Sequence, residues 1–416
     1  MIRKFHAPPK SEAFPENKIL HKLYEGLKNV FAGRQKSDKV LEHIFYSHKW
    51  WTPSQRAFAR NVFYYYIQHW RLLWHLIETE PNFQTSDMHR AYGAMCILEG
   101  QPLPKDKVFF KLDAQKILDE YRRIKSNPAI FHSWPDWLAE EILKNIPAKE
   151  QFETLAALGS RPPVFIRTNT LKGGPRALQE ALAKEGIVAK LVENNPQALE
   201  IESGEKLFRS EPFQTGLFEV QDINSQAVAT FCNPKPGSRV ADVCAGAGGK
   251  TLHLAALMQN KGRIWVSEIK KYKMDELRRR SARAGISIVE PHLSPDGKDI
   301  KRQHGKFDIV LVDAPCSGTG VVRRNPDIKW HIRPEGLAET IGTQQEILTK
   351  YSPLCKVGGE LIFAVCSLFP QEGSEAIRQF ISSNPNWSIT EEKHLPVKRN
   401  GGDGFYMVKL KRGGGA

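Results

Sequence analysis

Strand-like and helix-like segments alternate along the C-terminal half of the chain, from about residue 212 onward. The expected strands are short apolar runs at 239–243, 263–267, 286–290, 307–312 and 360–365. Parallel strands need long crossover connections, and helices commonly supply them. The alternation therefore predicts a doubly wound α/β domain with a largely parallel sheet over residues 212–412.

Two segments with different expected secondary structure precede this domain. Leucine, valine and isoleucine recur at spacings of three and four in residues 1–145, which predicts an all-helical domain. In its longest helical segment, Pro53 suits the first turn and Thr52 suits the cap before it. Residues 146–211 combine strand-like runs with one short helical pattern, which predicts a small α+β module. The glycine-rich residues 413–416 are expected to form a disordered tail.

Composition narrows the possible partners and compartments. The chain has 416 residues, 60 Lys and Arg against 46 Asp and Glu, and a formal net charge of +14. This excess indicates a polyanionic partner without identifying it. No apolar run approaches the ~18 residues that span a bilayer, and the basic N-terminus lacks the apolar core of a secretory signal. Six cysteines are too few for a disulfide framework, so we expect a reduced, cytoplasmic protein without membrane association.

The first expected strand of the α/β domain runs into a glycine-rich turn and then a helix. The turn comprises Cys244, Ala245, Gly246, Ala247, Gly248 and Gly249, followed by Lys250 and Thr251. A phosphate-binding P-loop would fit the last three of these residues, but Cys244 stands where its first glycine is needed. A nucleoside-binding turn instead predicts an acidic residue at the end of the next strand, where Glu268 lies. The nucleoside interpretation is favoured, and the P-loop remains an alternative.

Two of the six cysteines follow expected strands of the same sheet. Cys316 lies in the run 313–320, and Cys366 lies in the run 364–367. The carboxyl ends of parallel strands form the edge where ligands bind in open α/β sheets. A free cysteine is often simply buried, which would account for either residue alone. Two such cysteines, each followed by serine and near a nucleoside-binding turn, favour a role in chemistry.

The motifs resemble a known family. Residues 242–381 are similar to the catalytic core of the RNA (cytosine-5) methyltransferases, the Sun (NOL/NOP/Sun) superfamily. The most specific runs are Asp-Ala-Pro-Cys-Ser-Gly-Thr-Gly at 313–320 and Arg-Arg-Asn-Pro-Asp-Ile-Lys-Trp at 323–330. Residues 165–172 resemble the module that precedes this core. Residues 57–74 resemble the NusB-like helical domain of the ribosomal RNA small-subunit methyltransferase B family. The resemblance implies a Rossmann-like class I S-adenosylmethionine-dependent domain behind a NusB-like domain and an RRM-like module.

The resemblance also implies a reaction, methylation of C5 of a cytosine through a covalent adduct. It assigns Cys366 as the nucleophile that adds to C6, and Cys316 as the residue that assists proton removal and product release. Asp313 is expected to hold the N3 and N4 edge of the cytosine, and Lys250 to orient this carboxylate or the substrate. If Asp313 donates to N3, it must be protonated, which burial can achieve.

The cofactor implied by the resemblance is S-adenosylmethionine, with no metal. Residues 244–250 are expected to surround its methionine and ribose part, with Asp313 near the sulfonium. Glu268 matches the acid that accepts the ribose hydroxyls, and Asp296 matches the acid that binds the adenine amino group.

The chain departs from the family pattern near the nucleophile. Val365 stands where threonine is usual, and Gly373 stands where asparagine is usual. Neither change removes a cysteine or a cofactor carboxylate, so we expect an active enzyme.

Basic residues between the two cysteine motifs are candidates for RNA contact. Arg323, Arg324 and Lys329 are expected to hold phosphates, and Trp330 either stacks on a base or occupies a core position. The expected substrate is 16S rRNA, and the expected state is a monomer. The alternatives are a cytosine-5 methyltransferase acting on tRNA or another rRNA site, and more remotely a non-catalytic RNA-binding protein or a P-loop-like NTPase.

Overall fold

The structure, a computed structural model, describes residues 16–104, 107, 109, 112–144, 146–202 and 206–414. The chain divides into two compact units. The helical unit comprises the chain up to Arg161 together with Val322–Arg333, and the sheet unit comprises Pro162–Val321 and the chain from Pro334 onward. A short segment of the C-terminal half therefore belongs to the N-terminal unit.

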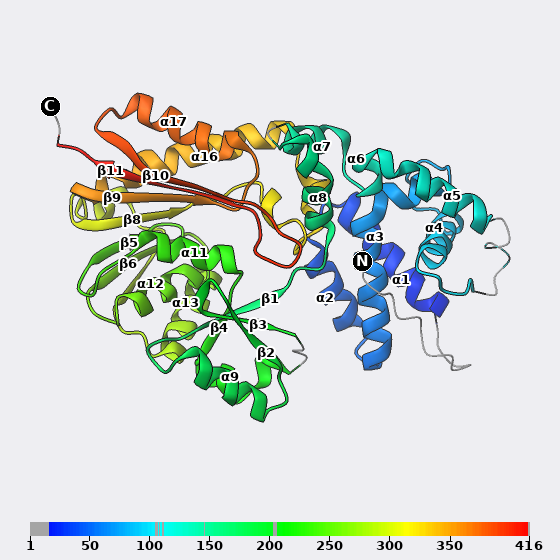
Figure 1. Ribbon diagram of the computed structural model, residues 1–416, viewed down its shortest axis with the longest axis horizontal. Helices are drawn as coiled ribbons and strands as arrows, with labels where there is room; N and C mark the ends of the chain where they lie inside the picture. Colours follow the sequence, from blue (N-terminus) through cyan, green and yellow to red (C-terminus); the bar gives the residue numbers. More distant parts are fainter. Residues whose placement is uncertain are drawn as a thin grey trace. The chain divides into compact units, whose positions relative to one another are not determined.

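Every regular element described in the helical unit is a helix (Figure 1). The α-helices are α1 (Glu16–Phe31), α2 (Ser37–Ser47), α3 (Pro53–Leu76), α4 (Thr85–Leu98), α5 (Ala114–Arg123), α6 (Pro128–Phe131), α7 (Asp136–Leu143), α8 (Ala148–Gly159) and α15 (Ile328–His331). The unit extends past the predicted boundary at residue 145 because α8 belongs to it. Among all described helices of the chain, none is both long and apolar enough to cross a membrane.

Helix α3 is the central helix of this unit, and its start is encoded locally. The backbone N–H of Gln55 donates to the Thr52 hydroxyl, and the Gln55 side chain accepts from the backbone N–H of Thr52. This reciprocal capping box, with Pro53 in the first turn, confirms the predicted helix start. Trp70 and Trp74 are buried on α3, so they form core and not a binding surface.

A small antiparallel sheet opens the sheet unit, with the strand order β2-β3-β1-β4. Its elements are β1 (Val164–Thr168), α9 (Pro175–Lys184), β2 (Ala189–Val192), β3 (Asn195–Ile201), α10 (Glu211–Gln214) and β4 (Phe218–Val220). Leu178 and Leu182 of α9 pack with Ile166 of β1 in its core. The predicted boundary at residue 211 falls inside this module, because β4 pairs with β1.

The predicted tail, residues 413–416, is described only in part. The backbone N–H of Gly413 donates to the carbonyl of Asn386, and residues 415 and 416 lie outside the described residues.

The main sheet has seven strands in the order β10-β11-β9-β8-β5-β6-β7. They are β5 (Arg239–Asp242), β6 (Arg263–Glu268), β7 (Val289–Leu293), β8 (Phe307–Asp313), β9 (Cys355–Val365), β10 (Trp387–Leu395) and β11 (Phe405–Arg412). Strands β5 to β9 pair in parallel, and β10 and β11 are antiparallel additions. This topology confirms the predicted Rossmann-like α/β class.

Helices cover both faces of the main sheet (Figure 1). They are α11 (Ile223–Cys232), α12 (Gly249–Leu257) and α13 (Lys271–Ala284) on one face, and α16 (Pro334–Tyr351) and α17 (Ser374–Ser383) on the other. Leu311 of β8 packs in the first core, whereas its neighbours Val310 and Val312 pack in the second. Because the strands are buried on both sides, they read as continuous apolar runs in the sequence. Their carboxyl ends form the edge that carries the predicted motifs.

Candidate active site

Cys316 and Cys366 lie side by side at the carboxyl ends of two neighbouring strands. Cys316 follows β8 and Cys366 follows β9, and the two strands pair in parallel up to Asp313 and Ala364. The sulfur atoms are 3.4 Å apart, in hydrogen-bond contact. The backbone N–H of Gly320 donates to the carbonyl of Cys366 at 3.0 Å, which ties the first cysteine loop to the second. The structure therefore brings together the two cysteines singled out in the sequence.

The surroundings of Cys316 favour its protonated form. The hydrogen bond with Cys366 and burial raise the pKa of Cys316 well above the ordinary thiol value. The negative charge of Glu372 acts in the same direction. Cys316 therefore keeps its S–H at neutral pH and can donate it toward the other sulfur.

One buried carboxylate, Glu372, holds both cysteine loops. Ser317 donates to it from its backbone N–H at 2.7 Å and from its hydroxyl at 2.5 Å, and Ser367 donates from its hydroxyl at 2.5 Å. Because each serine directly follows one of the cysteines, these bonds fix the separation of the two loops. Burial raises the pKa of Glu372, and the serine hydrogen bonds oppose that rise. Sequence reasoning did not identify Glu372 as a site residue and noted only that Gly373 after it departs from the family pattern. The one feature that could have indicated its function is the serine that follows each cysteine.

Lys250, in the first turn of α12, forms an ion pair with Asp313 at the end of β8. The ammonium nitrogen lies 2.6 Å from Oδ2 of the carboxylate, and the two side chains are 12% and 29% exposed. Burial alone would lower the pKa of Lys250, but the charge and hydrogen bond of Asp313 raise it overall, with a smaller contribution from Cys366. Lys250 is therefore a charged group that fixes the orientation of Asp313 next to the cysteines.

The glycine-rich turn joins β5 to α12 in a conformation that suits close approach to a ligand. Gly246 and Gly248 have φ of 57° and 87°, in the left-handed region. A Cβ at Gly248 would lie 2.8 Å from Cγ of Leu277, so a side chain is excluded there. Burial raises the pKa of Cys244 at the start of the turn, which keeps this cysteine a thiol. The backbone of the turn is thus free of side chains at the two points where it bends.

Two predicted cofactor carboxylates lie at the same sheet edge as the turn. Glu268 ends β6, and Asp296 follows β7, and β5, β6 and β7 are neighbours in the sheet. One oxygen of Glu268 accepts the backbone N–H of Lys270 at 2.8 Å, which orients the carboxylate. Asp296 caps α14 (Gly297–Lys301) by accepting the N–H of Asp299 at 2.8 Å. The structure brings both acids to the edge, and their contacts with a ligand stay predictions.

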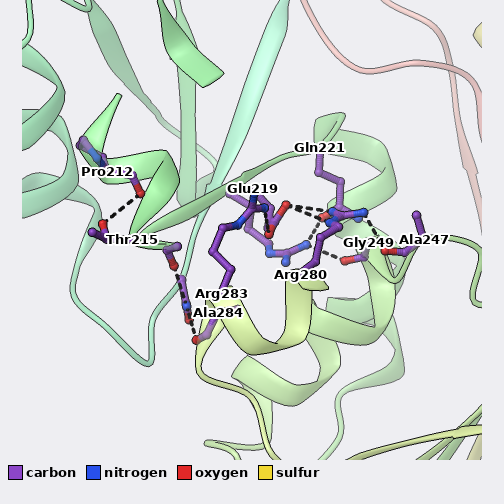
Figure 2. Close-up of polar contacts among 12 residues, drawn as sticks. Pro212, Thr215, Glu219, Gln221, Ala247, Gly249, Arg280, Arg283 and Ala284 are labelled. Carbon is purple, nitrogen blue, oxygen red and sulfur yellow. Dashed lines mark hydrogen bonds and ion pairs between the residues drawn. The ribbon is translucent and has the colours of Figure 1, made fainter. Parts of the chain in front are cut away.

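Two arginines that the sequence did not indicate as site residues hold the turn through its backbone carbonyls. Arg280 of α13 donates to the carbonyl of Ala247 at 2.8 Å (Figure 2). Arg167 of β1 donates to the carbonyl of Gly249 at 2.9 Å. Arg167 comes from the small module, so this module supports the turn of the main sheet directly.

One glutamate, Glu219, pairs with Arg280 and with Arg283 on the same helix (Figure 2). Glu219 of β4 is buried, and its two oxygens accept from Arg280 at 2.9 Å and from Arg283 at 2.6 Å. Burial lowers the pKa of Arg167 to about 9, and the charge of Glu219 opposes this effect. Sequence reasoning missed this group because its members come from three separate elements, β1, β4 and α13, which only the fold brings together.

The segment predicted to contact RNA phosphates is packed into the helical unit. Lys329 is 1% exposed, and its ammonium donates to the carbonyl of Gln68 at 2.7 Å. Burial lowers the pKa of Lys329 well below its usual value. The indole N–H of Trp330 donates to the carbonyl of Ile67 at 2.7 Å, and its ring packs near Phe31. The predicted phosphate contact of Lys329 is wrong because its charged group is buried in protein, and Trp330 takes the core position.

The start of this segment is also enclosed. Arg323 is buried and Arg324 is half-buried, and their contacts with RNA stay predictions. Asp327 fixes the segment by accepting the hydroxyl of Ser37 at 2.6 Å. A stretch between the two cysteine motifs therefore serves as part of the helical core.

Comparison with known proteins agrees with this geometry. Residues 229–411 match the family described as 16S rRNA methyltransferase RsmB/F, and residues 134–207 match the ferredoxin-like domain of RsmF/B-like methyltransferases. The crystal structure of PH0851 superposes with a TM-score of 0.77 at 23% identity, covering 97% of this chain and 100% of that chain. This likeness shows that the fold is shared.

Curated relatives establish the family. A Bacillus subtilis protein named probable ribosomal RNA small subunit methyltransferase B is 31% identical over 317 residues, covering 72% of this chain and 70% of the relative. Ribosomal RNA small subunit methyltransferase B of Photorhabdus laumondii is 30% identical, covering 69% of this chain and 68% of the relative. The methyl donor of the family is S-adenosylmethionine. By its family models and by these relatives, the chain belongs to the ribosomal RNA small subunit methyltransferase B family.

Proposed function

We propose that this chain transfers a methyl group from S-adenosylmethionine to C5 of a cytosine in 16S rRNA. The observation that carries the proposal is the pair of thiols of Cys316 and Cys366, 3.4 Å apart at adjacent strand ends. The names of the relatives indicate small-subunit rRNA as the substrate. Carbon C5 of cytosine is too weak a nucleophile to be methylated unaided, and a thiolate that adds to C6 activates it.

Cys366 is the proposed nucleophile, as the family resemblance implies. Its thiolate forms a bond to C6, and the electron pair of the C5–C6 double bond becomes available at C5. This carbon then bonds to the methyl group, which S-adenosylmethionine supplies as an electrophile when it is bound. Water accepts the C5 proton, and the electrons of the C5–H bond restore the C5–C6 double bond. The bond between C6 and the sulfur of Cys366 breaks at the same time and leaves its electron pair on the sulfur. Cys316 keeps its proton, and its S–H stabilises the departing thiolate at the neighbouring sulfur.

Asp313 is proposed to hold the Watson–Crick edge of the flipped cytosine. Lys250 occupies Oδ2 of this carboxylate at 2.6 Å, which directs Oδ1 toward the base. An ionised Asp313 accepts from the N4 amino group, whereas donation to N3 requires its protonated form. Single-turnover pH–rate profiles of the native enzyme and of Asp313→Asn distinguish acceptance from N4 and donation to N3. If a protonated Asp313 donates to N3, the native profile contains a titration that is absent from the profile of Asp313→Asn.

The residues at the sheet edge fit the proposed cofactor. Gly246 and Gly248 adopt the left-handed conformation that bends the turn, and their lack of side chains lets the backbone approach the methionine and ribose part. The fixed carboxylate of Glu268 suits two ribose hydroxyls, and Asp296 suits the adenine amino group. These residues bind and orient the methyl donor, while Cys316, Cys366 and Asp313 act on the base.

The substrate is tested with tritiated S-adenosylmethionine and deproteinised 16S rRNA, followed by bisulfite mapping. We expect label at one cytosine in 16S rRNA. Label in tRNA or large-subunit rRNA with none in 16S rRNA would instead identify the alternative substrate. No transfer to any RNA would refute methylation and leave a non-catalytic RNA-binding protein or an NTPase.

The roles of the cysteines are tested by trapping the adduct on denaturing gels. Cys316→Ala should accumulate a covalent complex with RNA, because product release is impaired, and Cys366→Ala should form none. Cys355→Ala is the matched control, since Cys355 is a buried cysteine at the opposite end of β9. The reverse pattern for the first two variants would exchange the roles.

A further inference from the structure

The last turn of α2 and the loop that follows it display two large aromatic side chains to solvent. Trp50 is 74% exposed and Tyr46 is 70% exposed, although Trp51 beside them is buried. Scattered exposed apolar residues are ordinary, but two neighbouring aromatic rings at this exposure indicate an interaction site. We call Tyr46, Lys49, Trp50 and Arg60 the aromatic corner.

The backbone under the aromatic corner is held in place. The guanidinium of Arg56 donates to the carbonyl of Trp51 at 3.1 Å and to that of Lys49 at 3.0 Å. The ring of His48 lies 5.2 Å from the ring of Trp50. The turn then runs directly into the capped start of α3. The exposed rings are therefore presented on an ordered frame, which reduces the entropy lost when a ligand binds.

The positive charge of the surrounding sequence indicates the chemical class of the ligand. Residues 43–77 contain four Lys or Arg and no Asp or Glu. The ammonium of Lys49 lies 4.2 Å from the centre of the Tyr46 ring. Arg60 is exposed, and its guanidinium lies 5.6 Å from the ring centre of Phe45, the residue before Tyr46. Cations interleaved with aromatic rings suit a polyanion with flat, unpaired bases, because bases stack on the rings and phosphates pair with the cations.

We propose that the aromatic corner binds a single-stranded stretch of the RNA substrate. Tyr46 and Trp50 stack on unpaired bases, and Lys49 and Arg60 neutralise the flanking phosphates. A duplex would not fit, because the faces of its bases are covered by neighbouring bases. This inference rests on the proposed function for the identity of the RNA, but the binding itself does not require catalysis.

The stacking is tested by fluorescence anisotropy with the full chain and two labelled RNAs, one unstructured and one a hairpin duplex. We expect Trp50→Ala and Tyr46→Ala each to weaken binding of the unstructured RNA by about fivefold or more, with little effect on the duplex. Val357→Ala is the control, because Val357 is an exposed apolar residue at the amino end of β9, away from the cysteine edge. Unchanged melting temperature and S-adenosylmethionine affinity should show that the variants remain folded.

The electrostatic part is tested by the salt dependence of the same binding. Lys49→Gln should reduce the slope of log affinity against log salt concentration by about one, as expected for one lost phosphate contact. Lys116→Gln is the matched control, because Lys116 is an exposed lysine of the helical unit that pairs with Glu78 at 2.7 Å. Its slope should equal that of the native protein.

Several results would overturn the proposal. The first is that Trp50→Ala binds the unstructured RNA as tightly as the native chain. The second is that Trp50→Ala and Val357→Ala lose RNA affinity equally. The third is that the native chain sediments as a dimer and Trp50→Ala as a monomer. If the native chain methylates 16S rRNA but Trp50→Ala binds RNA normally, the aromatic corner is refuted and the proposed function stands. If the native chain transfers no methyl group but Trp50→Ala loses RNA affinity, the corner stands and the proposed function fails.

Discussion

Replacing Glu219 by glutamine should loosen the glycine-rich turn without touching it. The two oxygens of Glu219 serve different arginines, Arg280 and Arg283. Arg280 in turn holds the carbonyl of Ala247 in the turn. A glutamine has one acceptor oxygen and one NH₂ group, so it must present donors to one of the two guanidiniums. The substitution therefore removes a charge and creates a donor–donor contact in a buried site.

The expected loss follows from the burial of this group. Removing one partner of a buried charge pair costs about 3–5 kcal/mol, because the other charge stays buried without compensation. Here Glu219 is 7% exposed at its side chain and faces three guanidiniums, including that of Arg167, whose pKa burial already lowers to about 9. At about 2–4 °C per kcal/mol for a unit of this size, the melting temperature should fall by roughly 6–20 °C. S-adenosylmethionine affinity should fall as well, because the turn loses a support.

Glu276→Gln is the matched control on helix α13. Glu276 forms an exposed pair with Arg279 on the same helix, and such pairs contribute at most about 0.5 kcal/mol. Calorimetric melting and titration with S-adenosylmethionine should leave Glu276→Gln close to native and place Glu219→Gln well below it. Equal melting temperatures and equal affinities for the two variants would show that the buried network does not support the turn.

Two further predictions concern buried carboxylates. Glu372→Gln should reduce the single-turnover methylation rate at least about tenfold with little change in S-adenosylmethionine affinity. The amide group of glutamine cannot accept the hydrogen bonds of both serine hydroxyls and of the Ser317 N–H as the carboxylate does. A native rate would contradict this. Burial raises the pKa of Asp242 to about 7, opposed by a hydrogen bond from Thr251, so this group favours folding below about pH 4 and loses that contribution as pH rises through 7. Asp242→Asn should therefore gain stability relative to the native chain as pH rises from about 4 to about 7, by a few kcal/mol in urea unfolding. A pH-independent difference would refute the shift.

The cysteine pair could be predicted from sequence because the topology of a parallel sheet is itself predictable. Strands with helical crossovers have their carboxyl ends at one edge, so residues after β8 and β9 had to approach each other. Apolar runs marked these strands because both faces are buried. The same logic did not reveal β10, whose residues between Trp387 and Leu395 are exposed and mostly polar or charged. As an edge strand, β10 is held by backbone pairing with β11, which leaves little side-chain pattern.

Contacts between distant segments account for the other differences. The sequence predicts Lys329 to be a phosphate ligand because the segment around it is basic and lies between the two cysteine motifs. Its partner, the carbonyl of Gln68, lies 261 residues earlier and carries no sequence signal, since every residue has a carbonyl. Arg167 and Glu219 were hidden for the same reason. Their function depends on which backbone atoms the folded chain places beside them.

The charges around the two sulfurs agree with the roles proposed for Cys316 and Cys366, which sequence position alone could not assign. Glu372 lies among the charges that raise the pKa of Cys316, while Lys250 interacts with Cys366. A negative group beside one sulfur and a positive group near the other create a field across a 3.4 Å pair. On the Cys316 side, the charge of Glu372 favours the protonated sulfur. This agrees with the role proposed for Cys316, which is to keep a proton that stabilises the departing sulfur of Cys366.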